Sequence, residues 1–343
     1  MRDVERVLRA AGGAGLRVVL LVLPIAQGAD AVLPSYLVDR RARAGPRCLT
    51  GQRVAQGAPR DLYGDPLAVE AAADHLTRLT RAFSNHPQLA AWELTAGCTD
   101  AVRPRPGSGL EAWAGELTGV LRRTGDPVRW TLSAGECLEP RGLALPAIAA
   151  LVDRVDVTAG LLDRPLLSPG GRRALPDPLD PGRAAAWPGF VATLAARLTA
   201  TAVGVAQLAI AVPPDGDPTA PAGWDAAAAV RWARPAHELV RAALGATAPV
   251  GGGALLDLGP RCARLPLLQR DPARRFAGLC TGAGEPKPWA TAAAAALARQ
   301  PGAAAPALPA LDPAAFLADA DAAVPELFEE WWRTWAAPPA AGA

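Results

Sequence analysis

The chain is poor in several residue types that binding and catalysis often use. It contains one asparagine, Asn85, one lysine, Lys287, two tyrosines and three histidines among 343 residues. Its formal charge of +2 comes from 35 basic and 33 acidic residues, so it has no basic excess that could follow a phosphate backbone. We therefore expect no nucleic acid partner.

Cysteine is also scarce, and its spacing is unlike that of a metal site. The five cysteines lie far apart, with no Cys-x-x-Cys pair and no clustered histidine, at Cys48, Cys98, Cys137, Cys262 and Cys280. Structural zinc sites need closely spaced pairs of ligands. We predict isolated thiols, no bound metal and no cofactor.

Long apolar runs are missing, since none reaches the roughly 20 residues that a helix needs to cross a bilayer. The run from Leu16 to Ala26 could be the core of a signal peptide, but the residues before it favour another interpretation. They have the spacing of a helix, with apolar residues at Val4, Val7, Leu8 and Ala11. We therefore predict a helix followed by a strand, in a soluble cytoplasmic protein without membrane contact.

Half of the residues are apolar, which allows a chain of this length to bury a large core. Short apolar segments alternate with longer helical patterns, as is typical of βαβ units and a parallel sheet. Strands are predicted at residues 16–23, 89–95, 128–133, 152–159, 203–212 and 250–258. Helices are predicted near 66–84, 109–124, 143–151, 186–201, 225–245 and 287–299.

One strand carries a family resemblance. Tyr63-Gly64-Asp65-Pro66, a long amphipathic helix and Phe83-Ser84-Asn85-His86-Pro87 lead to Trp92-Glu93-Leu94-Thr95-Ala96-Gly97. This series resembles the approach to the fourth strand of the cellulase- and mannanase-like (β/α)8 glycoside hydrolases, family 5 and its relatives. That strand reads Trp-Glu-Leu-x-Asn-Glu in the family, and its last residue is the acid/base. Here the acid/base falls on Gly97, and the only asparagine lies elsewhere, so no shift of the alignment restores the pair.

The resemblance implies an incomplete TIM barrel of about six of the eight strands. Gly15-Leu16-Arg17-Val18-Val19-Leu20 resembles the third strand of the family, so the first two strands would precede Met1. Phe276-Ala277-Gly278-Leu279 resembles the loop at the last strand. We expect the barrel domain at 1–299, an Ala/Pro linker at 300–313, a helix at 314–336 that packs on the barrel, and a disordered tail at 337–343. Unpaired barrel edges would favour an oligomer.

The resemblance also implies where a second catalytic carboxylate should be. Retaining hydrolases need two carboxyl groups about 5 to 5.5 Å apart, at the C-terminal ends of barrel strands. The nucleophile position falls on Ala209, and residues 203–214 contain no carboxylate. The histidine and tyrosine expected near Leu161 and Asp163 are missing as well. Asp257 stands where the family has a tryptophan that stacks on sugar rings.

Other residues could form a replacement site at the same barrel end. The acidic substitutes are Glu136, Asp163 and Asp257, and the alternative is that they are solvated loop residues; Glu139, Asp215 and Asp217 also follow strands. Trp92 and Trp224 are the candidates for contact with a sugar. Trp130 is expected in the core, and Glu93 in the barrel wall, because alternation places it opposite Trp92.

Three functions remain open on these grounds. The first is a catalytically degenerate glycoside-hydrolase-like protein that binds an oligosaccharide or polysaccharide. The second is an active glycosidase that hydrolyses O-glycosyl bonds with a rebuilt acidic site. The third is an interaction protein that pairs through its barrel edges and through the helix containing Trp331, Trp332 and Trp335.

Overall fold

The chain divides into two compact units. The computed structural model describes residues 1–27, 30–51, 53–105, 109–138, 143–160, 181–209, 225–245, 250, 254–270, 275–299 and 308–336. Unit 1 comprises Met1–Glu136, Pro140–Asp156 and Thr199–Thr201, and unit 2 comprises Cys137–Glu139, Val157–Leu198 and Ala202–Ala343. The division falls within strand β10, so this strand belongs to both units.

A five-stranded sheet with the order β1-β8-β9-β10-β11 forms the main sheet of the fold. Its strands are β1 (Val18–Leu21), β8 (Leu89–Ala96), β9 (Val128–Ser133), β10 (Arg154–Gly160) and β11 (Val203–Ala209). Strand β8 pairs in parallel with β1 and with β9, which places Trp92 opposite Val128. This parallel sheet with its flanking helices confirms the predicted α/β fold of TIM-barrel type.

The sixth predicted strand is present as β12 (Ala254–Leu256), and the structure adds a seventh, β13 (Gly278–Cys280). The two pair in parallel, with Ala254 opposite Gly278. From the family resemblance, a loop was predicted at β13. Three residues are too few to show the alternation by which a strand is recognised.

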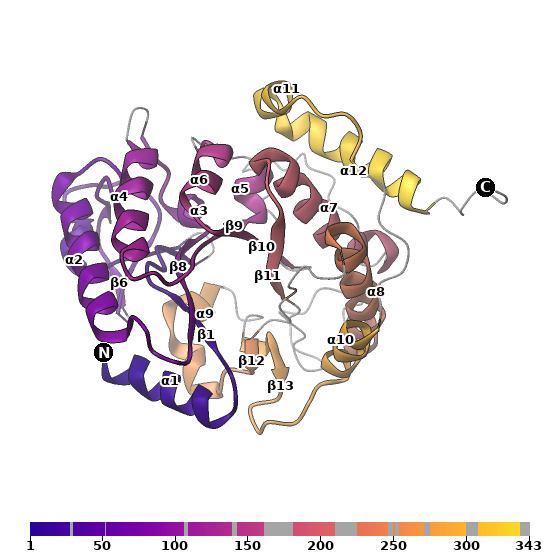
Figure 1. Ribbon diagram of the computed structural model, residues 1–343, viewed down its shortest axis with the longest axis horizontal. Coiled ribbons are helices and arrows are strands. Elements are labelled where there is room, and N and C mark those ends of the chain that lie inside the picture. Colours follow the sequence, from indigo (N-terminus) through magenta and orange to yellow (C-terminus); the bar gives the residue numbers. More distant parts are fainter. Residues whose placement is uncertain are drawn as a thin grey trace. The chain divides into compact units, whose positions relative to one another are not determined.

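The helices of unit 1 cover the sheet through their apolar faces, and α2 and α4 lie side by side (Figure 1). The longer helices of this unit are α1 (Arg2–Gly13), α2 (Pro66–Phe83), α4 (Leu110–Arg122) and α6 (Leu145–Leu151), and α3 (Cys98–Ala101) is a single turn. Helix α2 begins at Pro66, and the side chain of Asp65 accepts a hydrogen bond from the Leu67 N–H. This proline and this cap are typical of a helix start, which explains why its beginning was predictable.

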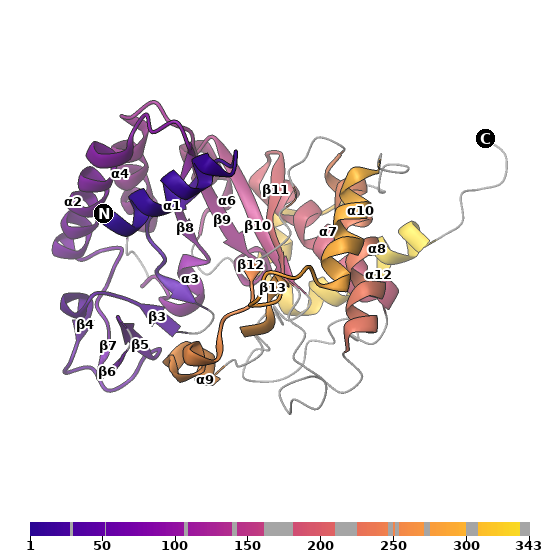
Figure 2. The same cartoon turned by 90° about the horizontal axis from the view of Figure 1, so that it is seen from below.

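Between β1 and α2 the chain forms short strands that the sequence analysis did not predict (Figure 2). One sheet has the order β2-β3-β5-β6, and β4 pairs with β7. Their bounds are β2 (Ala26–Gln27), β3 (Asp30–Val32), β4 (Val38–Asp39), β5 (Cys48–Thr50), β6 (Arg53–Ala55) and β7 (Ala58–Pro59). The carboxylate of Asp30, which is buried, forms an ion pair with Arg47, with 2.5 Å between Oδ2 and Nη2.

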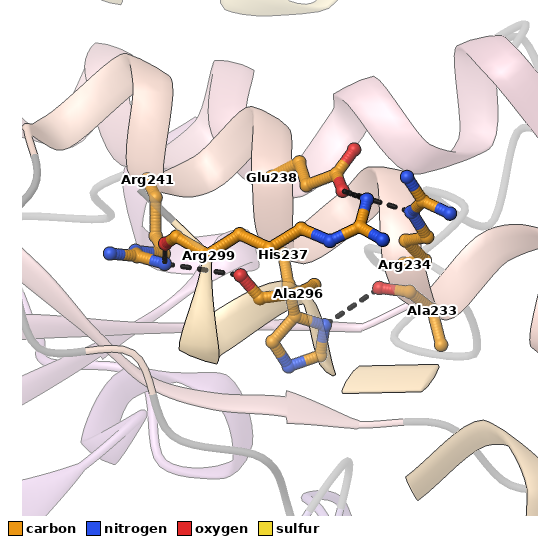
Figure 3. A network of polar contacts seen from close by, with 7 residues as sticks. All are labelled: Ala233, Arg234, His237, Glu238, Arg241, Ala296 and Arg299. Carbon is orange, nitrogen blue, oxygen red and sulfur yellow. Dashed lines mark hydrogen bonds and ion pairs between the residues drawn. The ribbon is translucent and has the colours of Figure 1, made fainter. Parts of the chain in front are cut away.

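In unit 2, the helices α8 and α10 lie against each other (Figure 3). The helices of this unit are α7 (Pro181–Thr199), α8 (Ala226–Leu244), α9 (Pro266–Arg270), α10 (Pro288–Ala298), α11 (Pro313–Ala318) and α12 (Ala320–Ala336). The guanidinium of Arg241 donates to the carbonyls of Ala296 and Leu297, at 3.1 and 2.8 Å. These carbonyls lie in the last turn of α10, where a cation satisfies groups that have no partner within the helix.

The C-terminal segment forms two helices where one was predicted. Helix α11 ends before Asp319, and α12 begins at Ala320. Helix α12 packs on α7, where the ring of Phe190 lies 5.3 Å from that of Phe328 and 5.8 Å from that of Trp331. Arg183 forms an ion pair with Glu329 across the same contact. Residues 300–307 of the predicted linker and the predicted tail at 337–343 lie outside the described residues.

Candidate functional site at the ends of β8 and β9

Gly97 follows β8 at the position where the family resemblance expects an acid/base. Its φ of +59° is left-handed, and it forms the N-cap of the short helix α3 (Cys98–Ala101). A Cβ atom built on Gly97 would lie 2.7 Å from Oδ2 of Asp100 and 3.3 Å from the Cβ atom of Ser133. The space beside residue 97 is therefore occupied by a carboxylate from one helical turn later.

Asp100 is not among the site residues predicted from the sequence, although it follows the end of a barrel strand, as Glu136 does. Its side chain is half-buried, and the Ser133 hydroxyl donates to its Oδ1 at 2.9 Å. The same hydroxyl accepts a hydrogen bond from the Glu136 N–H at 3.0 Å. Asp100 also lines a cavity of about 460 Å³ together with Ala101 and Val102. Asp100 is therefore the acidic residue at the end of β8 that is accessible from the cavity.

Glu136 joins the ends of β8 and β9 from inside the protein. Its Oε1 accepts hydrogen bonds from the N–H and the hydroxyl of Thr99, at 2.8 and 2.9 Å, and its Oε2 accepts from the Ser133 N–H at 3.2 Å. The side chain is 0% exposed. Burial raises the pKa of Glu136, while the hydrogen bonds from Thr99 and Ser133 oppose that rise. A carboxylate this enclosed has no route to a substrate, so its packing does not agree with its predicted role as a replacement catalyst.

Tyr63 and Cys98 are buried next to the end of β8. The Tyr63 hydroxyl lies 3.0 Å from the carbonyls of both Cys98 and Val102, and its single proton can be donated to either. Burial raises the pKa of Tyr63 and of Cys98 well above their ordinary values. The Tyr63 ring meets that of Trp113 edge to face at 5.1 Å. Both groups are therefore neutral supports of the backbone at α3.

Trp92 lies in the core. Its side chain is 0% exposed, and its indole N–H lies 3.1 Å from Oδ2 of Asp126 and 3.2 Å from Oγ1 of Thr124. A ring without exposed surface cannot stack on a sugar, so the predicted substrate contact of Trp92 does not agree with its packing. Trp130 is buried as predicted, and its ring meets that of Trp113 at 6.2 Å.

Glu93 is half-buried in the barrel wall, as the alternation predicted. Burial raises its pKa, and the negative charge of Asp156 adds to the rise, while Thr131 and Arg129 oppose it. Asp156 is itself buried and pairs with Arg129, with 3.6 Å between Oδ2 and Nη1. Glu93 is thus one member of a charged network between strands.

Asp257 is engaged in an ion pair within unit 2. Its Oδ1 lies 2.5 Å from Nζ of Lys287 and accepts a hydrogen bond from the Gly278 N–H at 3.0 Å. Lys287 is 6% exposed, and its ammonium also donates to the Phe276 carbonyl and lies 4.7 Å from the centre of the Trp289 ring. These contacts tie β12 to β13, so they do not agree with the catalytic role predicted for Asp257.

The remaining predicted positions add no described carboxylate. Ala209 is the last residue of β11, and its side chain is a methyl group. The candidates Asp163 and Trp224, together with Glu139, Asp215 and Asp217, lie outside the described residues.

Within the described part of the chain, no helix combines the length and apolarity that crossing a membrane requires. Among the same residues, no three His, Cys, Asp or Glu side chains are grouped so as to hold a metal ion.

The fold resembles solved glycoside hydrolases. A GH5_18 protein from Streptomyces cattleya in complex with GlcNAc matches with a TM-score of 0.68 and 18% identity, over 97% of this chain and 76% of that chain. The exo-beta-1,4-mannosidase Op5Man5 from Opitutaceae bacterium strain TAV5 matches with a TM-score of 0.62 and 15% identity, over 85% of this chain and 48% of that chain.

A GH5_18 protein from Bifidobacterium longum subsp. infantis matches with a TM-score of 0.60 and 17% identity, over 88% of this chain and 66% of that chain. Neither a protein-family model nor a curated protein matches the sequence. These similarities show that the chain has an α/β fold of TIM-barrel type, like that of these solved structures.

Proposed function

We propose that the chain is a glycoside-hydrolase-like protein that binds an oligosaccharide at the end of β8 without hydrolysing it. The observation that carries this proposal is the geometry at Gly97. The position expected to hold the acid/base has no side chain, and the neighbouring space holds the carboxylate of Asp100, fixed by Ser133.

Hydrolysis needs two carboxyl groups that both reach the glycosidic bond. Of the two carboxylates linked through Ser133, Glu136 is enclosed and hydrogen-bonded on both oxygens. That leaves Asp100 as the group of this pair that lines a cavity. Asp39 and Asp61 line the same cavity, but each accepts hydrogen bonds from backbone N–H groups. Asp100 can accept hydrogen bonds from sugar hydroxyls, but a single carboxylate cannot supply both the acid and the nucleophile or base.

The solved structures with this fold support a carbohydrate ligand. The Streptomyces cattleya GH5_18 protein is in complex with GlcNAc, and a point variant of it is in complex with Manβ1-4GlcNAc. We therefore propose the same class of ligand, a short oligosaccharide, for this chain.

Calorimetric titration with Manβ1-4GlcNAc tests the binding. We expect Asp100→Ala to weaken binding by about 10- to 150-fold, because a lost charge-assisted hydrogen bond costs about 1.5 to 3 kcal/mol. The matched control is Asp74→Ala, which removes a carboxylate that is 69% exposed on α2. Equal affinities of the unaltered protein, Asp100→Ala and Asp74→Ala would contradict binding at the end of β8.

A second candidate is a hydrolase in which Asp100 replaces the missing acid/base. The observation that favours it is the position of Oδ2, 2.7 Å from where a Cβ atom of residue 97 would be. This candidate predicts release of sugar products that Asp100→Asn abolishes and that Asp74→Asn leaves unchanged. The proposal of binding without hydrolysis predicts no product from any of these proteins.

A further inference from the structure

The cavity beside Asp100 adjoins a larger one within unit 1. The second cavity has a volume of about 970 Å³ and shares four residues with the first, namely Asp39, Arg60, Asp61 and Arg105. The two cavities therefore adjoin each other across a common wall, and together they are called the cleft. It runs from Asp100 to Tyr36, whose side chain is 59% exposed.

Arginines and aspartates line this cleft together. Its five arginines, hereafter the arginine cleft, are Arg40, Arg41, Arg60, Arg103 and Arg105. Arg60 lies 3.8 Å from Asp65, and none of the other four forms an ion pair with any residue that the structure describes. Each guanidinium carries five N–H donors, so the cleft offers many cationic donors. Its four aspartates, Asp39, Asp61, Asp65 and Asp100, bring the formal charge of the lining to +1, five minus four.

The carboxylates that line the cleft already accept hydrogen bonds from other groups of the protein. Oδ1 of Asp39 accepts from the Arg41 N–H at 2.9 Å, and Oδ1 of Asp61 accepts from the N–H groups of Tyr63 and Gly64 at 3.2 and 3.0 Å. Such contacts are those of turns. Asp65 caps α2, and Asp100 is held by Ser133. The acids therefore have structural partners, whereas four guanidinium groups have no ion-pair partner among the residues that the structure describes.

We infer that the arginine cleft binds the acidic group of an anionic oligosaccharide. This inference rests on the proposed function, and it adds the chemical class of the ligand. A uronate carboxylate or a sulfate ester presents oxygens that a guanidinium fork can bind in pairs. The ring of Tyr36 offers an aromatic face to a neighbouring sugar. Asp100 then contacts the hydroxyl groups of the sugar at the inner end of the cleft.

Two matched pairs of probes separate charge from sugar. The first pair is hexagalacturonate and its full methyl ester, and the second is sulfated and unsulfated maltohexaose. We expect each charged probe to bind the unaltered protein about tenfold more tightly than its neutral counterpart, since bidentate Arg–anion pairs are among the stronger hydrogen bonds. Preference for hexagalacturonate would assign a carboxylate ligand, and preference for the sulfated probe would assign a sulfate ester.

The variant for the site is Arg41→Gln with Arg105→Gln, and the control is Arg2→Gln with Arg81→Gln. Both double variants remove two positive charges from exposed positions of unit 1, but Arg2 and Arg81 do not line the cleft. We expect the cleft variant to lose about tenfold in affinity for the charged probe, and the control to lose less than about twofold. Equal losses in both variants would mean general charge attraction and would overturn the inference.

The remaining outcomes separate this inference from the proposed function. If the neutral probes or Manβ1-4GlcNAc bind and charge adds nothing, the inference is overturned and the proposed function stands. If no oligosaccharide binds, charged or neutral, both are overturned. The comparison of charged with neutral probes uses the unaltered protein, so it decides the question even if the cleft variant fails to fold.

Discussion

At the scale of single residues, burial makes the ionised form of Glu136 less stable than it would be in water. Burial raises its pKa, so the folded protein binds a proton at Glu136 more tightly than the unfolded chain does. Between the unfolded pKa, about 4.3, and the raised folded pKa, the folded state therefore carries the larger share of bound protons. The stability contributed by this group is full below that interval and falls as pH rises through it.

Glu136→Gln should remove this pH dependence. We expect the free energy of unfolding of the unaltered protein, relative to that of Glu136→Gln, to fall as pH rises from about 4 toward neutrality. Urea unfolding at several pH values measures the difference. Glu70→Gln, at an exposed position of α2, is the control and should give a flat difference. A difference that grows with pH would mean that the hydrogen bonds of Thr99 and Ser133 outweigh burial.

Gly97 is fixed by its backbone as well as by its neighbour. We expect Gly97→Ala to cost about 1 to 2 kcal/mol, because an L side chain is strained at a φ of +59°. Part of the cost comes from Asp100, whose carboxylate must turn away, so Gly97→Ala should cost less in an Asp100→Ala background.

Thermal or urea unfolding of the two single variants and the double variant checks this account of Gly97. Gly119→Ala is the control, since a Cβ atom on this exposed helical glycine meets nothing within 4 Å. It should stabilise α4 by about 0.5 to 1 kcal/mol. Equal costs of Gly97→Ala with and without Asp100 would contradict the contact.

The sequence predicts the loss at Gly97 but not the presence of Asp100 beside it. Motif alignment compares one position at a time, and the carboxylate that fills this space comes from three residues later. The short helix α3 places the carboxylate of Asp100 beside Gly97, and no sequence pattern predicts this helix. The strand that contains Trp92 was predictable. Its alternation did not show which of the two faces of the strand is turned toward the core.

At the scale of elements, the alternation of long apolar strands and helices was readable. The six predicted strands and the six helices predicted between and after them are present, and all except the three-residue β12 are long enough to show their period. The strands β2 to β7 have two or three residues each, and β13 has three, so no period can be detected in them. The cleft of unit 1 is lined largely by this unpredicted segment.

The pairing of β12 with β13 depends on the only lysine of the chain. We expect Lys287→Met to destabilise the protein by about 3 to 5 kcal/mol, since it leaves the carboxylate of Asp257 enclosed without its cation. The control is Arg234→Met, which breaks an exposed ion pair with Glu238 and should cost less than about 1 kcal/mol. Urea unfolding measures both, and similar small costs would contradict a structural role for Lys287.

At the scale of the whole molecule, the fold and the residues needed for activity can change independently of each other. Identities of 15 to 18% to solved hydrolases accompany TM-scores of 0.60 to 0.68. The fold is thus kept by patterns of apolar residues that tolerate wide substitution. Activity depends on a few carboxylates at strand ends, and the family resemblance had already placed Gly97 and Ala209 at those positions.

The most direct test of the central claim is a search for product. Purified protein is incubated with Manβ1-4GlcNAc and with aryl β-glycosides, and released sugar is followed by mass spectrometry, with Asp100→Asn measured in parallel. Binding without hydrolysis predicts no release above the buffer control from either protein, together with measurable binding of the disaccharide. Release by the unaltered protein that is lost in Asp100→Asn would contradict it.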